Sequence, residues 1–172
     1  MKHFITKREI VCVLIALTVA FVGSSVQAAE KKNISGTKVT KRLISRSTIN
    51  PGDDPRHVMT QVVREDTITS SDQDWNDVEA VSYEQADHIA GSGSHKGYIV
   101  IRHKGGDESY VTYHGTDKLA SGEGGAWEVS SEGEIQFIGG TGKYKDMKGS
   151  GKYKGKTTAK GSLVNWEATL EY

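Results

Sequence analysis

Short runs of alternating apolar and polar residues, separated by turn residues, follow one another from Glu79 to the end of the chain. The turn signals recur about every 8–12 residues, which is the spacing of strands in a sandwich or barrel. Two further β-branched, partly alternating segments, 38–46 and 57–69, flank the turn-rich Asn50–Pro55. No segment of useful length has a helical period. The pattern therefore predicts an all-β fold.

The clearest predicted hairpin joins residues 97–103 to residues 108–114 through Lys104–Asp107. A two-residue glycine turn gives cross-strand partners whose numbers sum to an odd number, for example Val100 opposite Val111. Both faces are then largely apolar, whereas a hairpin with one solvated face has a polar side. We expect a neighbouring subunit, a lid segment within 38–69 or a ligand to cover the second face. The first face is predicted to hold Tyr98, Val100, Arg102, Ser109, Val111 and Tyr113, and the second Ile99, Ile101, His103, Tyr110, Thr112 and His114.

Glycine is unevenly placed: 17 of the 20 glycines lie between Gly91 and Gly161. Both prolines lie earlier, at positions 51 and 55. This division indicates a looser lead-in followed by a dense series of turns. We expect lead-in strands and loops over 29–77 and the main part of the barrel over 78–172, with 29–172 forming one domain.

The N-terminal residues have the three-part layout of a secretory signal. Basic residues precede an apolar run of 14 residues from Ile10 to Gly23, and small residues follow it. At about 1.5 Å rise per residue this run is too short to cross a bilayer core of about 30 Å. We expect 1–28 to be a signal peptide cleaved after Ala28, with Ala29 as the near alternative site. The other alternative is an uncleaved N-terminal anchor.

Cleavage would remove Cys12, the single cysteine of the chain. The expected mature protein therefore has no disulfide and no cysteine for a lipid, and its core alone must stabilise it. We expect it to be exported to the periplasm or the exterior, with no membrane association after cleavage.

Charge is balanced over the whole chain, with 22 Lys+Arg against 22 Asp+Glu. A net charge of zero argues against a nucleic-acid partner, because such domains are clearly basic. Lysines do cluster between Lys143 and Lys160. We interpret them as a solvated strand face that blocks edge pairing, and a surface for anionic partners is the alternative.

The segment Gly139–Tyr144 (GGTGKY), followed by Lys148–Tyr153 (KGSGKY), resembles a signature of the allene oxide cyclase-like barrels, whose plant relatives include the dirigent proteins. The resemblance covers 78–172. It implies a closed antiparallel barrel of roughly eight strands, of a size that holds one small ligand. It also implies assembly into a homo-oligomer, with a trimer favoured as in the plant relatives.

Catalytic residues are not carried over from this resemblance. The cyclases use an acidic residue and a polar cluster that holds a water inside the barrel. Glu65 and Asp66 lie in the corresponding early strand, but their flanks lack the plant motif.

Other catalytic signals are absent from the expected mature sequence. It has no Gly-x-Ser-x-Gly elbow, phosphate loop or cysteine nucleophile, so we predict no cofactor. Its histidines are interpreted as solvated or core-edge residues, and we predict no metal site. The acidic segment Asp72–Glu79 is interpreted as a polar loop, with a calcium site as the alternative, because the glycine of an EF-hand is missing.

Aromatic residues are numerous enough either to line a cavity or to fill the core of a small barrel. We predict an exported barrel that binds a small apolar or aromatic ligand or has a structural role. The alternative is a cofactor-independent cyclase or isomerase acting on a hydrophobic substrate inside the barrel. A buried carboxylate or tyrosine pair facing a void would favour the enzyme, and a filled interior would favour the structural role. The predicted ligand-lining residues are Tyr98, Val100, Val111, Tyr113 and Phe137.

Export gives the first testable prediction. Intact-mass analysis of protein recovered from the envelope or medium of the native host is expected to give a chain that begins at Ala29 or Glu30. A cytoplasmic protein that retains Met1 would contradict it.

Overall fold

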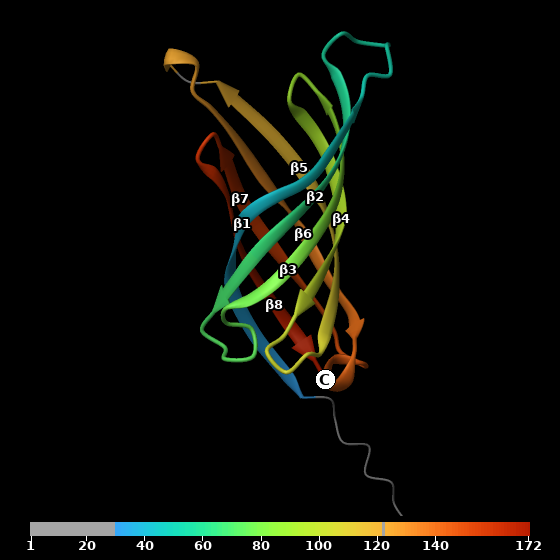
Figure 1. Ribbon diagram of the computed structural model, residues 1–172, viewed down its shortest axis with the longest axis vertical. Coiled ribbons are helices and arrows are strands. Elements are labelled where there is room, and N and C mark those ends of the chain that lie inside the picture. The colour runs from blue at the N-terminus through green and yellow to red at the C-terminus, as the bar shows by residue number, and fades with distance from the viewer. Residues whose placement is uncertain (1–29, 122) are drawn as a thin grey trace, which may run out of the picture.

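Consecutive antiparallel strands pair in chain order in the computed structural model, which describes residues 30–121 and 123–172 (Figure 1). The first strand also pairs with the last, so the eight strands close into one barrel. This confirms the predicted all-β antiparallel barrel, while the predicted signal peptide lies outside the described residues. The strands are β1 (Lys31–Ile49), β2 (His57–Ser70), β3 (Val78–Ile89), β4 (Ser92–Arg102), β5 (Glu108–Ser121), β6 (Trp127–Gly140), β7 (Lys148–Thr158) and β8 (Gly161–Glu171).

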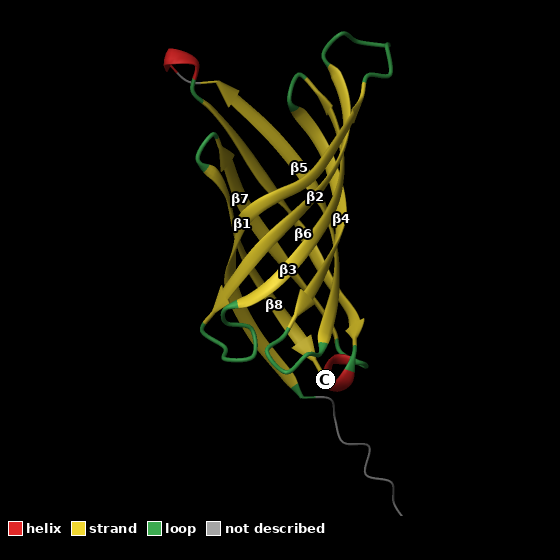
Figure 2. Cartoon of the chain, viewed as in Figure 1, coloured by secondary structure: helices red, strands yellow, loops and turns green. Residues whose placement is uncertain are grey.

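Two short 3₁₀ turns lie at opposite ends of the barrel (Figure 2). The turn η1 (Glu123–Gly125) joins β5 to β6, and η2 (Gly142–Tyr144) joins β6 to β7. Over the residues described, no helix is long and apolar enough to cross a membrane.

Strict alternation of side chains sorts each strand into an inner and an outer face. In β8, Trp166, Ala168 and Leu170 are buried, and the residues between them are exposed. Because successive side chains of a strand point to opposite faces, the first set lines the interior. The inward positions of the other strands follow from the same register.

The turn between β4 and β5 has three residues rather than the predicted two. The His103 amide donates to the Asp107 carbonyl, and the Gly106 amide donates to the His103 carbonyl, each at 2.9 Å. Gly106 has φ of 88°, a left-handed conformation that suits the third position of such a loop. Three loop residues make partner numbers sum to an even number, so Ile99 lies opposite Val111.

This register corrects the predicted faces of the hairpin. The inner face carries Ile99, Ile101 and His103 from β4, and the outer face carries Tyr98 and Val100. The prediction was wrong because one extra loop residue exchanges the two faces of one strand relative to the other. On β5, Ser109, Val111 and Tyr113 point inward, and Tyr110, Thr112 and His114 point outward.

The lead-in segment supplies two full strands of the barrel wall. Strands β1 and β2 pair along most of their length, so residues 38–69 are part of the wall and do not form a lid. Register shifts between Thr40 and Arg42, and between Leu43 and Ser45, bend β1. Beyond Val39, β1 pairs with β2 alone among the described residues.

A tryptophan plug closes one end of the barrel. Trp75 lies in the loop between β2 and β3, and its side chain is fully buried. It makes edge contacts with His103 at 4.8 Å and with Phe137 at 5.5 Å between ring centroids. Tyr144 stacks on His103 at 3.9 Å, and Met147 is also buried here. The acidic loop predicted at 72–79 therefore delivers an apolar side chain to the core.

Polar contacts hold the plug in place. Asp72 pairs with Lys32, and Asp74 pairs with Lys143 at 2.8 Å. His103 bonds the Asp74 carbonyl through Nδ1 and the Ser109 hydroxyl through Nε2, each at 2.9 Å. Burial lowers the pKa of His103, which fits a neutral ring with both nitrogens satisfied.

Replacement of the plug gives the second prediction. Trp75→Ala is expected to lower the free energy of unfolding by about 3–5 kcal/mol, because it leaves a large cavity in a closed core. Urea denaturation measures this change. Trp127→Ala is the matched control, since Trp127 is 42% exposed at the opposite end, and its expected loss is about 1 kcal/mol or less. Equal losses in the two variants would contradict the role of the plug.

Candidate functional site

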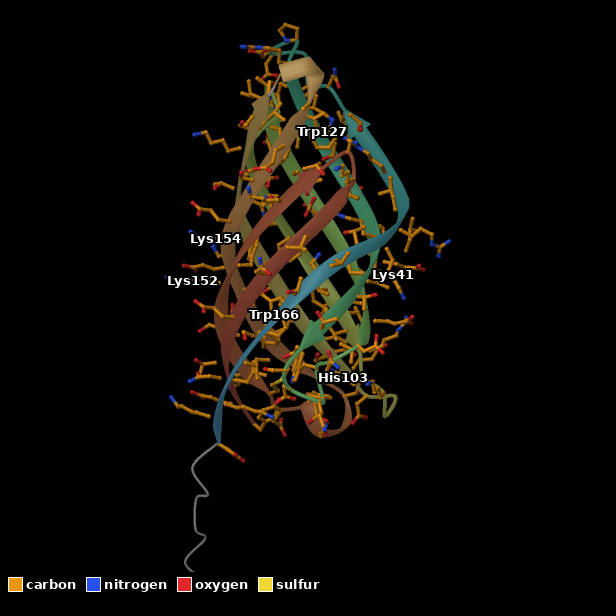
Figure 3. The ribbon with its side chains drawn as sticks, turned by 90° about the vertical axis from the view of Figure 1, so that its left-hand side faces the viewer. Lys41, His103, Trp127, Lys152, Lys154 and Trp166 are labelled. Carbon is orange, nitrogen blue, oxygen red and sulfur yellow. The ribbon has the colours of Figure 1, made fainter. Side chains whose placement is uncertain are left out.

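The barrel interior contains a cavity of about 460 Å³. Its lining includes Trp75 at the plugged end and Trp127. Trp127 lies at the opposite end of the barrel (Figure 3) and is exposed to solvent. The cavity is therefore closed at the Trp75 end and open at the Trp127 end. Its volume lies within the range of about 300–1,000 Å³ that small-molecule sites occupy.

Most of the cavity wall near the Trp75 plug is apolar. Ile99, Ile101, Val111, Ile135 and Phe137 all line the cavity and are buried. Such a surface gains about 25 cal/mol for each Å² of apolar ligand area that it removes from water. This wall favours a mainly hydrocarbon guest.

A buried polar relay crosses one side of the cavity. The hydroxyl of Tyr153 on β7 bonds Nε2 of His95 on β4. His95 Nδ1 lies 3.0 Å from Oδ2 of Asp117 on β5, although poorly aligned for a hydrogen bond. His88 Nε2 contacts the same carboxylate at 2.9 Å, and the Ser131 hydroxyl donates to its other oxygen. One carboxylate therefore orients two imidazole rings.

The charge state of this relay is set by its surroundings. Burial alone would raise the pKa of Asp117, but its contacts with His88, His95 and Ser131 outweigh burial and hold that pKa well below its usual range. Burial raises the pKa of Tyr153, and the negative charge of Asp117 raises it further. The carboxyl is therefore ionised and the phenol protonated at neutral pH.

A second polar group faces the relay. The Tyr113 hydroxyl donates to Glu84 Oε2 at 3.1 Å, and Arg64 pairs with Glu84 Oε1. Burial, followed by the charge of Glu84, raises the pKa of Tyr113. The rings of Tyr113 and Tyr153 meet edge to face, with centroids 6.1 Å apart. Two tyrosines and two carboxylates thus border one void.

Paired glycines make room for the Tyr153 hydroxyl. Gly115 on β5 lies opposite Gly133 on β6, and Gly133 lies opposite Tyr153 on β7. A Cβ atom at Gly133 would come within 2.6 Å of the Tyr153 oxygen, and one at Gly115 would also overlap it. The Tyr153 hydroxyl can therefore occupy this position only because Gly115 and Gly133 have no side chains.

A third polar network lies in the wall formed by β1, β2 and β3. Asp66 is buried, accepts a hydrogen bond from Thr40 at 2.8 Å, and pairs with Lys38 at 3.1 Å. Ser82 donates to the same carboxylate. Glu65, the preceding residue, points outward and pairs with Arg42. Of the two acidic residues noted in the sequence, only Asp66 thus faces the interior.

Two buried donors in the cavity wall lack a partner. Arg64 Nε and Trp166 Nε1 are buried without a hydrogen bond, and both residues line the cavity. A buried unpaired donor costs about 1–3 kcal/mol. Neither atom has accessible surface, so both lie behind the surface of the cavity.

The five residues predicted to line a ligand site divide between the two faces. Val111, Tyr113 and Phe137 line the cavity, whereas Tyr98 and Val100 lie on the outer surface. The sequence pattern did not reveal the polar residues of the cavity, including His95, Asp117 and Glu84. The alternation of apolar and polar residues could have indicated their inward positions. Glu84 and Asp117 lie an even number of residues from buried neighbours in their strands, so their side chains point to the same face.

The lysine cluster lies on the outside. Lys152 and Lys154 on β7 project away from the barrel (Figure 3). They lie opposite Glu134 and Glu132 on β6, and Lys152 also lies opposite Glu167 on β8. The basic strand is thus flanked by acidic ones, as expected for a solvated face. Among the described side chains, no group of three His, Cys, Asp or Glu is placed to hold a metal ion.

Comparison with known proteins identifies the fold. No family model and no curated protein matches this sequence. The chain is similar in structure to the pterocarpan synthase dirigent protein PsPTS1, with a TM-score of 0.51 over 85% of this chain and 97% of that chain. The two sequences are 13% identical. The chain therefore has a dirigent-like barrel fold, which confirms that part of the resemblance.

The third prediction concerns Asp117. Asp117→Asn is expected to lower the free energy of unfolding near neutral pH by about 2 kcal/mol, because charge-assisted hydrogen bonds weaken. The folded-state pKa lies below the unfolded value of about 3.9, so this stabilisation is fully present above that pH and is lost as the pH falls through the folded-state pKa. Urea denaturation at a series of pH values measures both effects. The exposed Asp146→Asn is the control, and equal acid sensitivity of the Asp117 variant and the wild type would contradict the prediction.

Proposed function

We propose that this barrel binds a small, mainly apolar molecule that carries at least one oxygen acceptor. The observation that supports it most is the cavity itself, which is apolar near the Trp75 plug, polar at one side and open to solvent at the Trp127 end. The apolar wall would hold the hydrocarbon part of the guest. The polar side, where the Tyr153 hydroxyl lines the cavity, would hold its oxygen.

The alternative function, a cofactor-independent cyclase or isomerase, is favoured by a separate observation. Tyr113, Tyr153, Glu84 and Asp117 all line the void, which is the arrangement expected of acid–base chemistry on a bound substrate. A dry, filled interior would have favoured a structural role instead. The dirigent-like fold and the proposed allene oxide cyclase-like relationship are both compatible with such a site.

Ligand binding is the fourth prediction. Thermal-shift screening with fatty acids, terpenoids and phenolics is expected to raise the melting temperature, because a ligand at about 100 times its Kd adds about 2.7 kcal/mol to the folded state. Ala86→Phe is expected to abolish the shift, since residue 86 lines the cavity. Val100→Phe, on the outer surface, is the matched control. A screen without any shift would contradict the proposal.

We also propose that the protein acts after export, as a homo-oligomer with a trimer favoured. The outer surfaces of β2 to β5 form an apolar outer face, where Tyr98 and Tyr110 pack with ring centroids 6.1 Å apart. Tyr83, beside them, is 47% exposed. Burial against a second copy would remove this face from water. The residues of the apolar outer face are Val63, Val81, Tyr83, Tyr98, Val100 and Tyr110.

Oligomerisation is the fifth prediction. Light scattering at micromolar concentration is expected to give a mass above that of one chain, and Val100→Lys to lower it to that of a monomer. Asn165→Lys, on the exposed surface of β8, is the control and keeps the wild-type mass. A wild-type monomer would contradict the proposed assembly and leave the ligand proposal intact.

A further inference from the structure

We propose that the cavity is an acid–base site for carbonyl compounds, in which the Tyr153 hydroxyl gives a proton to the carbonyl oxygen of an enolisable ketone or aldehyde. This inference rests on the proposed function, because the compound must first bind in the cavity. It names the substrate class and assigns roles to the polar groups there. The roles follow from four observations.

The first observation is the partner of Tyr153. Its hydroxyl meets His95 Nε2, and the other nitrogen of the ring faces the ionised Asp117. When His95 carries protons on both nitrogens, Nε2 donates to the Tyr153 oxygen and leaves the Tyr153 O–H free for a guest. Asp117 stabilises this cationic ring. Tyr153 is therefore the catalytic acid, His95 supplies its replacement proton, and Asp117 is a positioning residue that stabilises the protonated ring.

The second observation is a base that borders the same void. Glu84 lines the cavity, and each of its oxygens has a partner, Arg64 on Oε1 and Tyr113 on Oε2. A carboxylate oxygen accepts more than one hydrogen bond, so Glu84 still has lone pairs for an incoming proton. Arg64 and Tyr113 hold the carboxylate in one orientation, which is what a positioned base requires.

The proton and electron balance of the step is complete without a cofactor. Glu84 takes a proton from the carbon next to the carbonyl, and the C–H electron pair becomes the carbon–carbon double bond of the enol. The carbonyl oxygen takes a proton from Tyr153, which regains one from His95. Glu84 exchanges the proton that it took with solvent through the open end of the cavity. In the reverse step Glu84 gives a solvent-derived proton to the carbon, the enol oxygen returns its proton to Tyr153, and Tyr153 returns one to His95. Every group ends in its starting state, and nothing is oxidised or reduced.

The third observation is the donor side chains of the wall. Tyr113, Tyr153 and His95 line the cavity and carry O–H or N–H groups. The two carboxylates there, Glu84 and Asp117, already accept hydrogen bonds. A carbonyl oxygen accepts hydrogen bonds and donates none. A guest with this group therefore satisfies the wall better than one that must also donate.

The fourth observation is that the polar groups lie beside an apolar wall. Ile99, Val111 and Ile135 are buried cavity residues, and Tyr113 joins them to the relay. Apolar surroundings strengthen the hydrogen bond that Tyr153 gives to developing negative charge on the carbonyl oxygen. The favoured substrate is thus a compact apolar ketone rather than a sugar or a charged acid.

Proton exchange measured by NMR tests this assignment. The purified protein is mixed with 2-tetralone in D₂O, and loss of the signal of the protons next to its carbonyl is followed. Wild-type protein is expected to exceed the buffer rate. Tyr153→Phe is expected to lower the protein-dependent rate by about 10²-fold or more while the Kd for 2-tetralone, from a thermal-shift titration, stays within about threefold.

Matched variants separate chemistry from folding. Tyr98→Phe removes an outer-surface hydroxyl and is expected to leave the rate unchanged. Asp117→Asn keeps a side chain of the same shape and is expected to lower the rate with little change in Kd, measured below its melting temperature. Loss of binding in step with the rate would instead mark Asp117 as purely structural and overturn its role.

The outcomes distinguish this inference from the proposed function. Binding of 2-tetralone with exchange at the buffer rate, or an unchanged rate in Tyr153→Phe, overturns the acid–base assignment and leaves ligand binding standing. If neither 2-tetralone nor the hydrocarbon tetralin shifts the melting temperature, the proposed function and this inference both fail. Tetralin binding without 2-tetralone binding overturns this inference and the proposed oxygen acceptor, and leaves the binding of an apolar guest standing.

Discussion

Every internal feature of this protein depends on the pairing of β1 with β8. Nine registered residue pairs, from Lys31 with Glu171 to Val39 with Leu163, close the sheet on itself. In an open sheet, the inward residues of all strands would face water, and the relay of Asp117, His95 and Tyr153 would not be buried. Closure also removes most sheet edges, which otherwise pair with other chains.

A closed wall leaves an interior that must be filled, plugged or kept open. The two ends of this barrel differ. Trp75 and Tyr144 fill one end, and the end at Trp127 is open to solvent. Ionisable groups in the middle are costly to bury, and each is offset by a partner, such as Arg64 for Glu84 and His88 for Asp117. Retention of several such groups beside a void is more consistent with a site than with a core selected for stability alone.

The sequence predicted the class of fold and part of the interior. Turn spacing and alternation identified the strands, and the glycine-rich segment 139–153 indicated the barrel. Two things escaped the pattern. The loop after His103 has one residue more than predicted, so Tyr98 and Val100 lie on the outer face. A change of one residue in loop length exchanges the inner and outer faces of a strand relative to its partner. Trp75 lies in an acidic segment, so the pattern did not mark it as a core residue. Inward polar residues such as His95 and Asp117 cannot be distinguished from solvated ones in the sequence, because they meet only in the closed barrel.

The chain-order topology has a consequence for how the barrel forms. Seven of the strand pairings join neighbours along the chain, whereas the closing contact between Asn33 and Thr169 spans 136 residues. The long loop makes this pairing the entropically costly one, so we expect it to form late and to limit the folding rate. The cavity exists only once the β1–β8 pairing, the seam of the barrel, has formed. A guest molecule that stabilises the native state would therefore act chiefly by slowing the opening of the seam, and ligand residence and barrel lifetime would be kinetically coupled.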